Sequence, residues 1–216
     1  CKVVKFVDRT FNANPSRANA IWKQLLDDRY TLKYHFEICA TLLNEESFAI
    51  LSRFPKGKIQ LEVGLQSTNE QTLGAVSRHL NPHTVIEASK RILAMDNIDI
   101  YLDLIAGLPY EDIHSFAKSF DDAYDACTRL QVGFLKLLPG TVLRRAAEKY
   151  GYISMERAPY TVMQSFWMSF TDMMIVHDIH ELCERYLEGG KFVRTFKVLR
   201  EHISSPFEFW NSFHSY

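Results

Sequence analysis

The feature that most constrains this chain is a strand-then-helix unit that recurs five times before residue 151. Short runs rich in branched and aromatic residues alternate with segments of helical periodicity. The expected strands cover residues 3–8, 33–39, 58–65, 98–106 and 131–138. Strands that alternate with helices predict a parallel sheet with helical crossovers. We therefore expect an α/β fold, a partial parallel (β/α) TIM-like barrel of about five units over residues 1–151.

The pattern changes after Gly151. Residues 152–216 predict a helical appendage with helices near 160–187, 191–202 and 206–213, the first two separated by Gly189 and Gly190. A stripe of apolar residues at helical spacing predicts packing of the first helix against the barrel. The stripe consists of Phe166, Trp167, Phe170, Met173, Met174 and Ile175. His177 and His180 can share a helix face, but no third ligand is obvious nearby, so we expect no metal there.

Composition narrows the class of partner. The 216 residues are 47% hydrophobic with a formal charge of -1, which suits a folded α/β protein and offers no broad basic face for nucleic acid. The longest uncharged stretch, residues 158–171, is too short to cross a bilayer, so no membrane span is expected. Four scattered cysteines without metal-type spacing favour buried free thiols and a cytoplasmic location. The strand-like start, without an initiator Met, suggests a piece of a longer protein.

Polar residues mark the carboxyl ends of the predicted strands, where parallel sheets bind ligands. They are Asp8, Glu37, Gln66, Asp103 and the backbone around Leu137. Asp103 interrupts an apolar run that we interpret as a strand covered on both faces, so its carboxylate is either paired with donors or used for a ligand. Glu111 and Asp112 follow, and we place them in the first turn of the next helix.

Three sequence pieces, read in order, resemble one family. They are residues 62–67 (EVGLQS) with Arg78-His79 following, residues 103–109 (DLIAGLP) and residues 135–141 (LKLLPGT). Together they resemble radical S-adenosylmethionine (radical SAM) enzymes, in particular the coproporphyrinogen dehydrogenase-like barrels and those with an upstream cobalamin-binding domain. The opening residues 4–12 (VKFVDRTFN) and the helical tail are most similar to the cobalamin-linked proteins.

The resemblance implies roles for strand-end residues. Asp8, Arg9 and Thr10 stand where the family has a glycine-glycine-acid turn for the amino group of SAM. Glu37 matches the third-strand acid, Gln66 with Ser67 the ribose contact, and Arg78 the partner of the methionine carboxylate. Asp103 matches an acid near the ribose, and the backbone around Leu137 the adenine contact. A zwitterionic ligand with ribose hydroxyls needs one guanidinium and several acceptors of this kind.

The resemblance also implies cofactors that this chain cannot hold alone. In the family, a Cys-x-x-x-Cys-x-x-Cys loop binds a [4Fe-4S] cluster that cleaves SAM reductively to a 5'-deoxyadenosyl radical, or methyl transfer proceeds through cobalamin. That loop is absent here. We therefore expect the cluster ligands, and any cobalamin, in upstream parts of a longer enzyme, and the 216 residues alone to be inactive. The substrate does not follow from these residues.

Two other hypotheses stay open at this point. One is a metal-dependent barrel hydrolase or lyase with Asp8, Glu37, Glu62 and Asp103 as oxygen ligands. The other is a non-catalytic binding module in which the polar groups satisfy each other. A barrel without its first unit also exposes an edge strand near residues 3–7, which predicts self-association.

Overall fold

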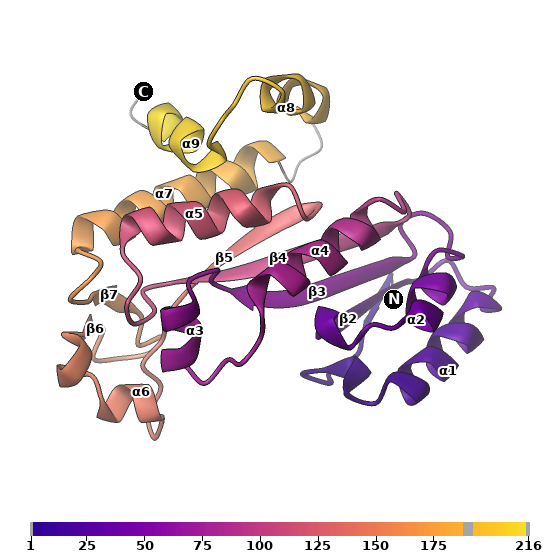
Figure 1. The fold of residues 1–216 in the computed structure, drawn as a ribbon, viewed down its shortest axis with the longest axis horizontal. Coiled ribbons are helices and arrows are strands. Elements are labelled where there is room, and N and C mark those ends of the chain that lie inside the picture. Colours follow the sequence, from indigo (N-terminus) through magenta and orange to yellow (C-terminus); the bar gives the residue numbers. More distant parts are fainter. Residues whose placement is uncertain (1, 188–191, 215–216) are drawn as a thin grey trace. The chain divides into compact units, whose positions relative to one another are not determined.

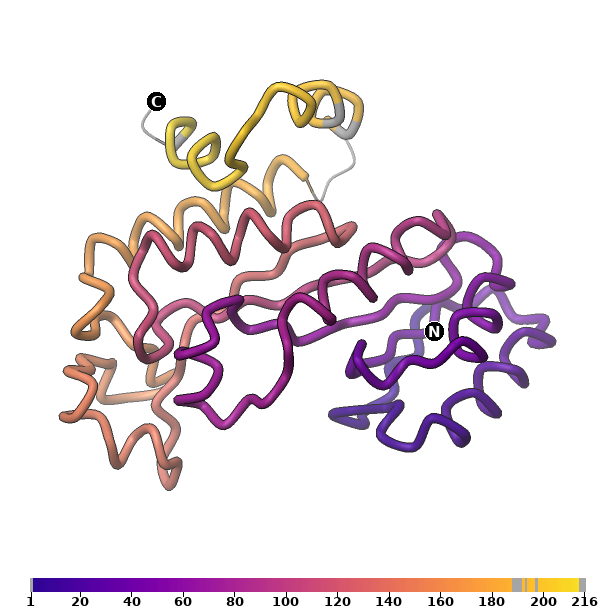
Figure 2. Tube along the Cα trace, in the orientation of Figure 1, coloured from indigo at the N-terminus to yellow at the C-terminus, as the bar shows by residue number. Residues whose placement is uncertain are grey.

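The computed structural model describes residues 2–187 and 192–214. The chain packs as two compact units, shown as a ribbon in Figure 1 and as a trace in Figure 2. The first unit comprises residues 1–65, 80–103 and 123–130, and the second comprises residues 66–79, 104–122 and 131–216. The predicted division at residue 151 into a barrel part and an appendage stays a prediction.

Five strands form one parallel sheet in chain order (Figure 1). They are β1 (Val3–Lys5), β2 (Lys33–Ile38), β3 (Ile59–Gln66), β4 (Ile98–Ala106) and β5 (Arg129–Phe134). β1 and β5 are the two ends of the strand order, and the predicted α/β fold is confirmed. β1 is shorter than expected, although Phe6 N–H still donates to His35 O. β5 begins and ends earlier than predicted.

Helices separate the strands, and side-chain caps define where several of them begin. The helices are α1 (Pro15–Leu26), α2 (Glu45–Leu51), α3 (Glu70–Ala75), α4 (Pro82–Leu93) and α5 (Ile113–Tyr124), with 3-10 turns η1 (Phe11–Ala13) and η2 (Ala40–Leu42). Asn14 caps α1, Asn44 caps α2 and Asn69 caps α3. In each case the Asn amide oxygen accepts N–H groups that the first helical turn leaves unpaired.

The C-terminal part is not entirely helical. After α6 (Val142–Arg145) and the turn η3 (Glu148–Tyr150), the strands β6 (Ile153–Ser154) and β7 (Val162–Gln164) pair antiparallel. The helices α7 (Phe170–Leu187), α8 (Val193–Arg200) and α9 (Pro206–His214) follow, so the expectation of helices alone was wrong for the residues before Phe170. The predicted breaker Gly189-Gly190 lies outside the described residues.

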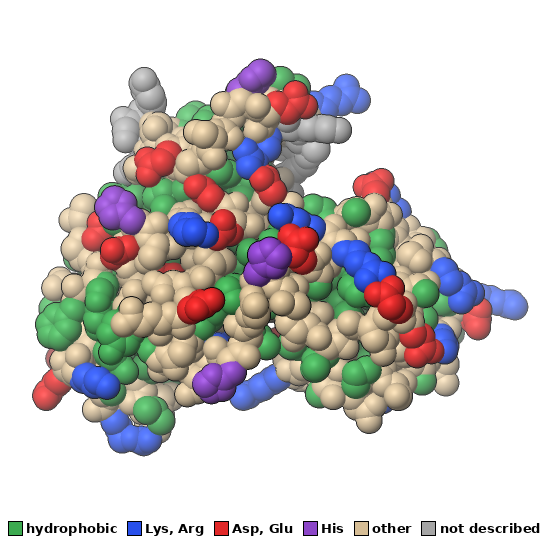
Figure 3. Space-filling model, in the orientation of Figure 1, with side chains coloured by type: hydrophobic (Ala, Val, Ile, Leu, Met, Phe, Trp, Pro, Cys, Tyr) green, Lys and Arg blue, Asp and Glu red, His purple; other side chains and the backbone are tan. Residues whose placement is uncertain are grey.

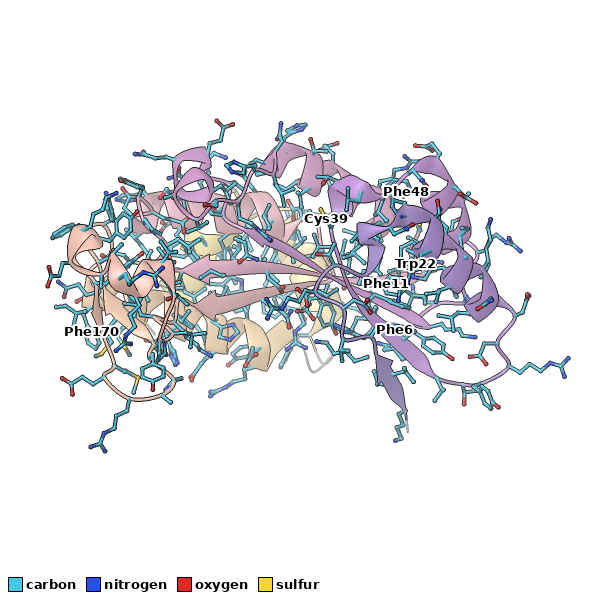
Figure 4. The ribbon with its side chains drawn as sticks, turned by 90° about the horizontal axis from the view of Figure 1, so that it is seen from below. Phe6, Phe11, Trp22, Cys39, Phe48 and Phe170 are labelled. Atoms are coloured by element: carbon cyan, nitrogen blue, oxygen red, sulfur yellow. The ribbon has the colours of Figure 1, made fainter. Side chains whose placement is uncertain are left out.

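Residues of the strands β3 and β4 alternate strictly between a buried and a half-exposed face. In β3 and β4 every second residue is buried, so the helix-covered face carries only apolar side chains there. In the first unit this face continues into an aromatic cluster in which Phe36 stacks on Phe6 and contacts Phe11 and Trp22. Figure 4 shows Phe6, Phe11 and Trp22 gathered together. The prediction that β4 is covered on both faces was wrong, because its other face carries polar residues.

In the second unit, α9 docks on α5 through both apolar and polar contacts. The ring of Phe207 meets Phe116 and Phe120 edge-on, and the N–H of Phe207 donates to Asp121 Oδ1 at 2.7 Å. In Figure 1, α7 runs alongside α5, and α9 lies above them. Asp121 thereby satisfies a first-turn donor of α9, which anchors the start of that helix.

The predicted apolar stripe is only partly core. Met173 is buried, but Phe166 and Phe170 precede or start α7 and, like Met174, are exposed. Exposed Ile153, Met155 and Met163 lie on or beside the hairpin, and Figure 3 shows hydrophobic side chains gathered over β6 and β7. Among the described residues, no helix combines the length and the apolar character needed to span a bilayer.

Candidate functional site

The half-exposed face of the sheet carries the strand-end residues that the sequence singles out. In the first unit, Glu37 on β2 and Asp103 on β4 both lie on it. The sequence suggested that Asp103 faces an apolar environment. This was wrong, because the buried side chains of β4 point to the opposite face. A carboxylate on a half-exposed face keeps part of its hydration, so Asp103 needs no special pairing to be tolerated.

A hydrogen-bonded cluster lies beside Glu37 on the same face. The parallel register places Lys5 opposite His35, His35 opposite Gln60, and Glu37 opposite Glu62. His35 Nε2 lies 2.7 Å from Glu62 Oε2 and its Nδ1 lies 2.7 Å from Gln60 Nε2. Lys5 Nζ also reaches Glu62 Oε2, at 3.3 Å. Both ring nitrogens and one carboxylate oxygen are therefore held in place.

The environment of His35 favours its neutral form. Burial lowers the pKa of the imidazole, and the positive charge of Lys5 lowers it further, whereas the hydrogen bond to Glu62 opposes both. A neutral ring with Gln60 Nε2 donating to Nδ1 carries its proton on Nε2, where it donates to Glu62. His35 thus orients the Glu62 carboxylate, and sequence reasoning missed this because the pairing of three strands creates it.

The loop after β1 holds the residues expected near the amino group of SAM. Asp8 pairs with Arg17 of α1 at 3.6 Å, and Thr10 Oγ1 donates to the Arg9 carbonyl. Asn12, almost fully buried, donates from Nδ2 to Cys39 O and accepts from Cys39 N–H, both at 2.9 Å. This side chain replaces a strand partner and ties the loop to the end of β2, two residues beyond Glu37.

In the second unit, Gln66 ends β3 in a left-handed conformation. Its φ is +72°, which non-glycine residues rarely adopt, and the next residue, Ser67, is fully buried. Ser67 Oγ donates to Glu111 Oε1 at 2.5 Å and accepts from Asn69 N–H at 2.9 Å. Ser67 therefore holds the turn that presents Gln66, rather than facing a ligand directly.

Glu111 is the residue of this unit whose place the sequence did not reveal. We expected it in the first helical turn, but α5 begins at Ile113, and Asp112 accepts the Ser115 N–H as a cap does. Glu111 therefore precedes the helix and is completely buried. Burial raises the pKa of its carboxyl group to about 7, against hydrogen bonds from Ser67 and Ser119 that lower it. The spacing Asp112 to Ser115 was the signal that could have shown this.

Arg78 follows the end of α3, and its backbone is fixed there. Its N–H donates to Leu73 O at 2.9 Å, and Ser77 before it has a φ of +57°. This is a Schellman-type helix end. The side chain is half-buried, so Arg78 is not simply a solvated surface residue.

The backbone around Leu137 is bonded mainly to its own chain. Leu137 N–H donates to Tyr160 O, and its carbonyl accepts from Arg144 Nη1 at 2.7 Å. Lys136 forms an isolated antiparallel bridge with Thr161. The Leu137 carbonyl keeps a second lone pair, which can accept one further hydrogen bond.

The predicted site residues are thus distributed over two units. The first holds Asp8, Arg9, Thr10, Glu37 and Asp103, and the second holds Gln66, Ser67, Arg78 and Leu137. Within them, Asn12 brings the Asp8 loop to the end of β2, and Glu111 braces the Gln66 turn. Convergence of all nine on one rim stays a prediction.

No group of three or more His, Cys, Asp and Glu residues in the described part of the chain is placed to hold a metal ion. Cys39, Cys127 and Cys183 are free thiols, and Cys1 lies outside the described residues. The described residues therefore do not fit a [4Fe-4S] cluster, which needs thiolate ligands grouped together. His177 and His180 lie along α7, each within 4 Å of a glutamate one turn on.

Comparison with known proteins identifies the fold. Residues 148–216 match the family described as "Protein of unknown function (DUF4080)", and no curated protein matches the chain. The radical S-adenosylmethionine methyltransferase TsrM from Kitasatospora setae superposes with a TM-score of 0.57 at 14% identity, over 72% of this chain and 33% of TsrM.

Two further solved structures agree with this comparison. The cobalamin-dependent S-adenosylmethionine radical enzyme OxsB is similar with a TM-score of 0.53 at 13% identity, over 95% of this chain and 36% of OxsB. Elp3 from the archaeon Methanocaldococcus infernus has a TM-score of 0.51 at 15% identity, over 68% of this chain and 40% of Elp3. This chain spans about a third of the length of these proteins, and it has the fold of the radical S-adenosylmethionine enzymes.

Proposed function

We propose that this chain is the SAM-binding part of a radical SAM enzyme. The observation that carries the proposal is the polar half-exposed face of a parallel sheet with this fold, on which Glu37 and Asp103 lie at or near the carboxyl ends of their strands. Carboxylates at such positions accept hydrogen bonds from an ammonium group or ribose hydroxyls. Gln66, presented by its left-handed turn, adds an amide that can both donate and accept.

Arg78 supplies the positive charge that the carboxylate of SAM requires. It is half-buried, and its backbone is fixed by the end of α3, so a contact from its guanidinium costs less conformational entropy than one from a flexible loop. Asp8, Arg9 and Thr10 serve the amino group through the loop that Asn12 anchors. Ser67 supports Gln66, and the backbone around Leu137 meets the adenine.

The bound cluster supplies an electron to SAM in enzymes of this class. Because the described cysteines do not form a cluster site, its ligands come from outside these 216 residues. The residues of this chain bind and orient SAM. Cobalamin and the substrate are assigned to other parts of the enzyme, and the reaction is either methyl transfer or another radical conversion.

Calorimetric titration with SAM tests the proposal in the complete enzyme, in which the upstream cluster ligands are present and the cluster is reconstituted. Arg78→Ala removes one charge-assisted pair and is expected to weaken SAM binding by about 1.5 to 3 kcal/mol, roughly ten- to a hundredfold. Arg53→Ala is the matched control, because Arg53 is exposed in the first unit and assigned no ligand contact. Unchanged affinity for Arg78→Ala would remove Arg78 from the site. Absence of SAM binding by the wild-type protein would refute the function.

A further inference from the structure

The buried carboxyl group of Glu111 has no ligand role in the proposed function, yet it contacts the turn that presents Gln66. Its Oε1 accepts from Ser67 Oγ at 2.5 Å and lies 3.4 Å from Ser119 Oγ. Its Oε2 is buried with no hydrogen-bond partner among the described residues. One oxygen is thus committed to the turn, and the other lacks the donors that a carboxylate charge requires.

The turn itself is strained, and side-chain hydrogen bonds from this network hold it. Gln66 and Tyr110 both have left-handed backbones, with φ of +72° and +62°. Asn69 links them, because its N–H donates to Ser67 Oγ and its Nδ2 donates to the Tyr110 carbonyl at 3.1 Å. Strained residues of this kind persist only where the surroundings over-determine them.

We propose that Glu111 is a positioning residue for Gln66, whose uncharged carboxyl group holds the turn through Ser67 and whose ionisation loosens that turn. The inference rests on the proposed function for the identity of the ligand that Gln66 meets. It makes SAM binding depend on pH through a group that does not touch SAM.

The physical reason is the environment of the carboxyl group. Ionisation of Glu111 would place negative charge on Oε2, where no hydrogen-bond donor lies among the described residues. Water or a displaced backbone N–H would then have to donate to it. The charged groups around the network do not offset this. Asp112 adds negative charge beside it, and Asp122, reached through Thr68, is already paired with Lys118. A pKa raised to about 7 by burial places the change within the physiological range.

NMR titration between pH 5.5 and 8.5 tests the positioning without any ligand. In the wild-type chain, the Glu111 carboxyl carbon and the backbone amides of Gln66 and Asn69 are expected to titrate with one shared midpoint near 7. Glu111→Gln keeps the shape of the side chain but cannot ionise, so the two amide titrations should disappear. Glu148→Gln, at an exposed glutamate of the same unit, should leave them unchanged. If Glu111→Gln does not fold, the wild-type titration alone tests the positioning role: a shared midpoint supports it, and separate midpoints contradict it.

SAM titration at pH 6 and pH 8 completes the test. In the wild-type protein the dissociation constant is expected to rise about five- to tenfold at pH 8, a typical coupling between two sites, and to stay constant in Glu111→Gln. SAM binding without the shared NMR midpoint would overturn the positioning role. A shared midpoint without SAM binding would support the positioning and overturn only the proposed ligand.

Discussion

His35 in the first unit and Glu111 in the second are both buried titratable side chains held by hydrogen bonds, yet they respond to pH in opposite directions. Burial is the largest cause in both cases, lowering the pKa of His35 and raising that of Glu111. Their surroundings differ: His35 has a partner at each ring nitrogen, whereas Glu111 Oε2 has none in the described structure. One physical effect, the exclusion of charge from a buried site, thus destabilises the first unit in acid and the second above neutrality.

The largest expected effect concerns Glu111. Its carboxyl group has a pKa of about 7 in the folded chain, against the ordinary value of 4.5 that applies to the unfolded chain. As the pH rises, the unfolded chain therefore loses this proton at a lower pH than the folded chain. The contribution to stability is therefore full below pH 4.5 and is lost as the pH rises through 7. The difference corresponds to about 3 kcal/mol. Glu111→Gln should accordingly be more stable than the wild type at pH 8 and show no such gain at pH 4.5.

Urea denaturation at the two pH values measures this difference, with Glu148→Gln as the control at an exposed site. A gain of equal size at both pH values would show that the substitution acts by packing rather than by removing a buried charge. The comparison with His35 would then lose its electrostatic basis.

A second variant tests a buried polar residue that cannot titrate. Asn12→Ala removes both hydrogen bonds to the Cys39 backbone and leaves the N–H and carbonyl of this half-buried residue without their partner, at a cost of about 2 kcal/mol. Asn12→Asp keeps the acceptor and loses the donor, so its cost near neutrality should be intermediate. Denaturation and amide exchange at Cys39 provide the measurement. The cost of Asn12→Ala should not vary between pH 5 and 8, and a variation would indicate that other groups dominate the pH response.

The smallest effect is expected at His35. Because its folded pKa lies below the ordinary 6.5, its contribution to stability is present above pH 6.5 and is lost as the pH falls through the folded value. His35→Gln removes this acid sensitivity, while at pH 8 it costs about 1 kcal/mol by leaving Glu62 and Gln60 with poorer partners. His83→Gln is the control on the exposed start of α4. Unfolding curves at pH 5.5 and 8 give the loss of unfolding free energy in acid for each variant. An equal loss in His35→Gln and His83→Gln would refute this account.

Periodicity was sufficient to predict the five strands and most of the helices between them. β2 and α9 were placed within a residue or two of their observed bounds. The errors fall where a signal is short. The two strands of the β6–β7 hairpin have two and three residues, too few to show alternation, and the Met and aromatic residues around them were assigned to a helix.

The sequence named Asp8, Glu37, Gln66 and Asp103 as candidates from their place at or near the carboxyl ends of the expected strands, and their role in one site stays a prediction. What sequence could not show is which neighbours they have. Asn12, His35 and Glu111 act on strands or turns 27 to 44 residues away, as the bonds to Cys39, Glu62 and Ser67 show. Such pairs depend on register and helix docking, which no local pattern contains.

The sequence by itself determined the fold class, because the order of strands and helices and the alternation within each strand are properties of neighbouring residues. It also determined which residue types stand at the strand ends. Only the tertiary structure decided the protonation of the buried groups, since a carboxyl or imidazole pKa depends on solvent exclusion and on partners far along the chain. For this reason Glu111 belongs to the buried support of the Gln66 turn and not, as its sequence position suggests, to the solvated start of a helix.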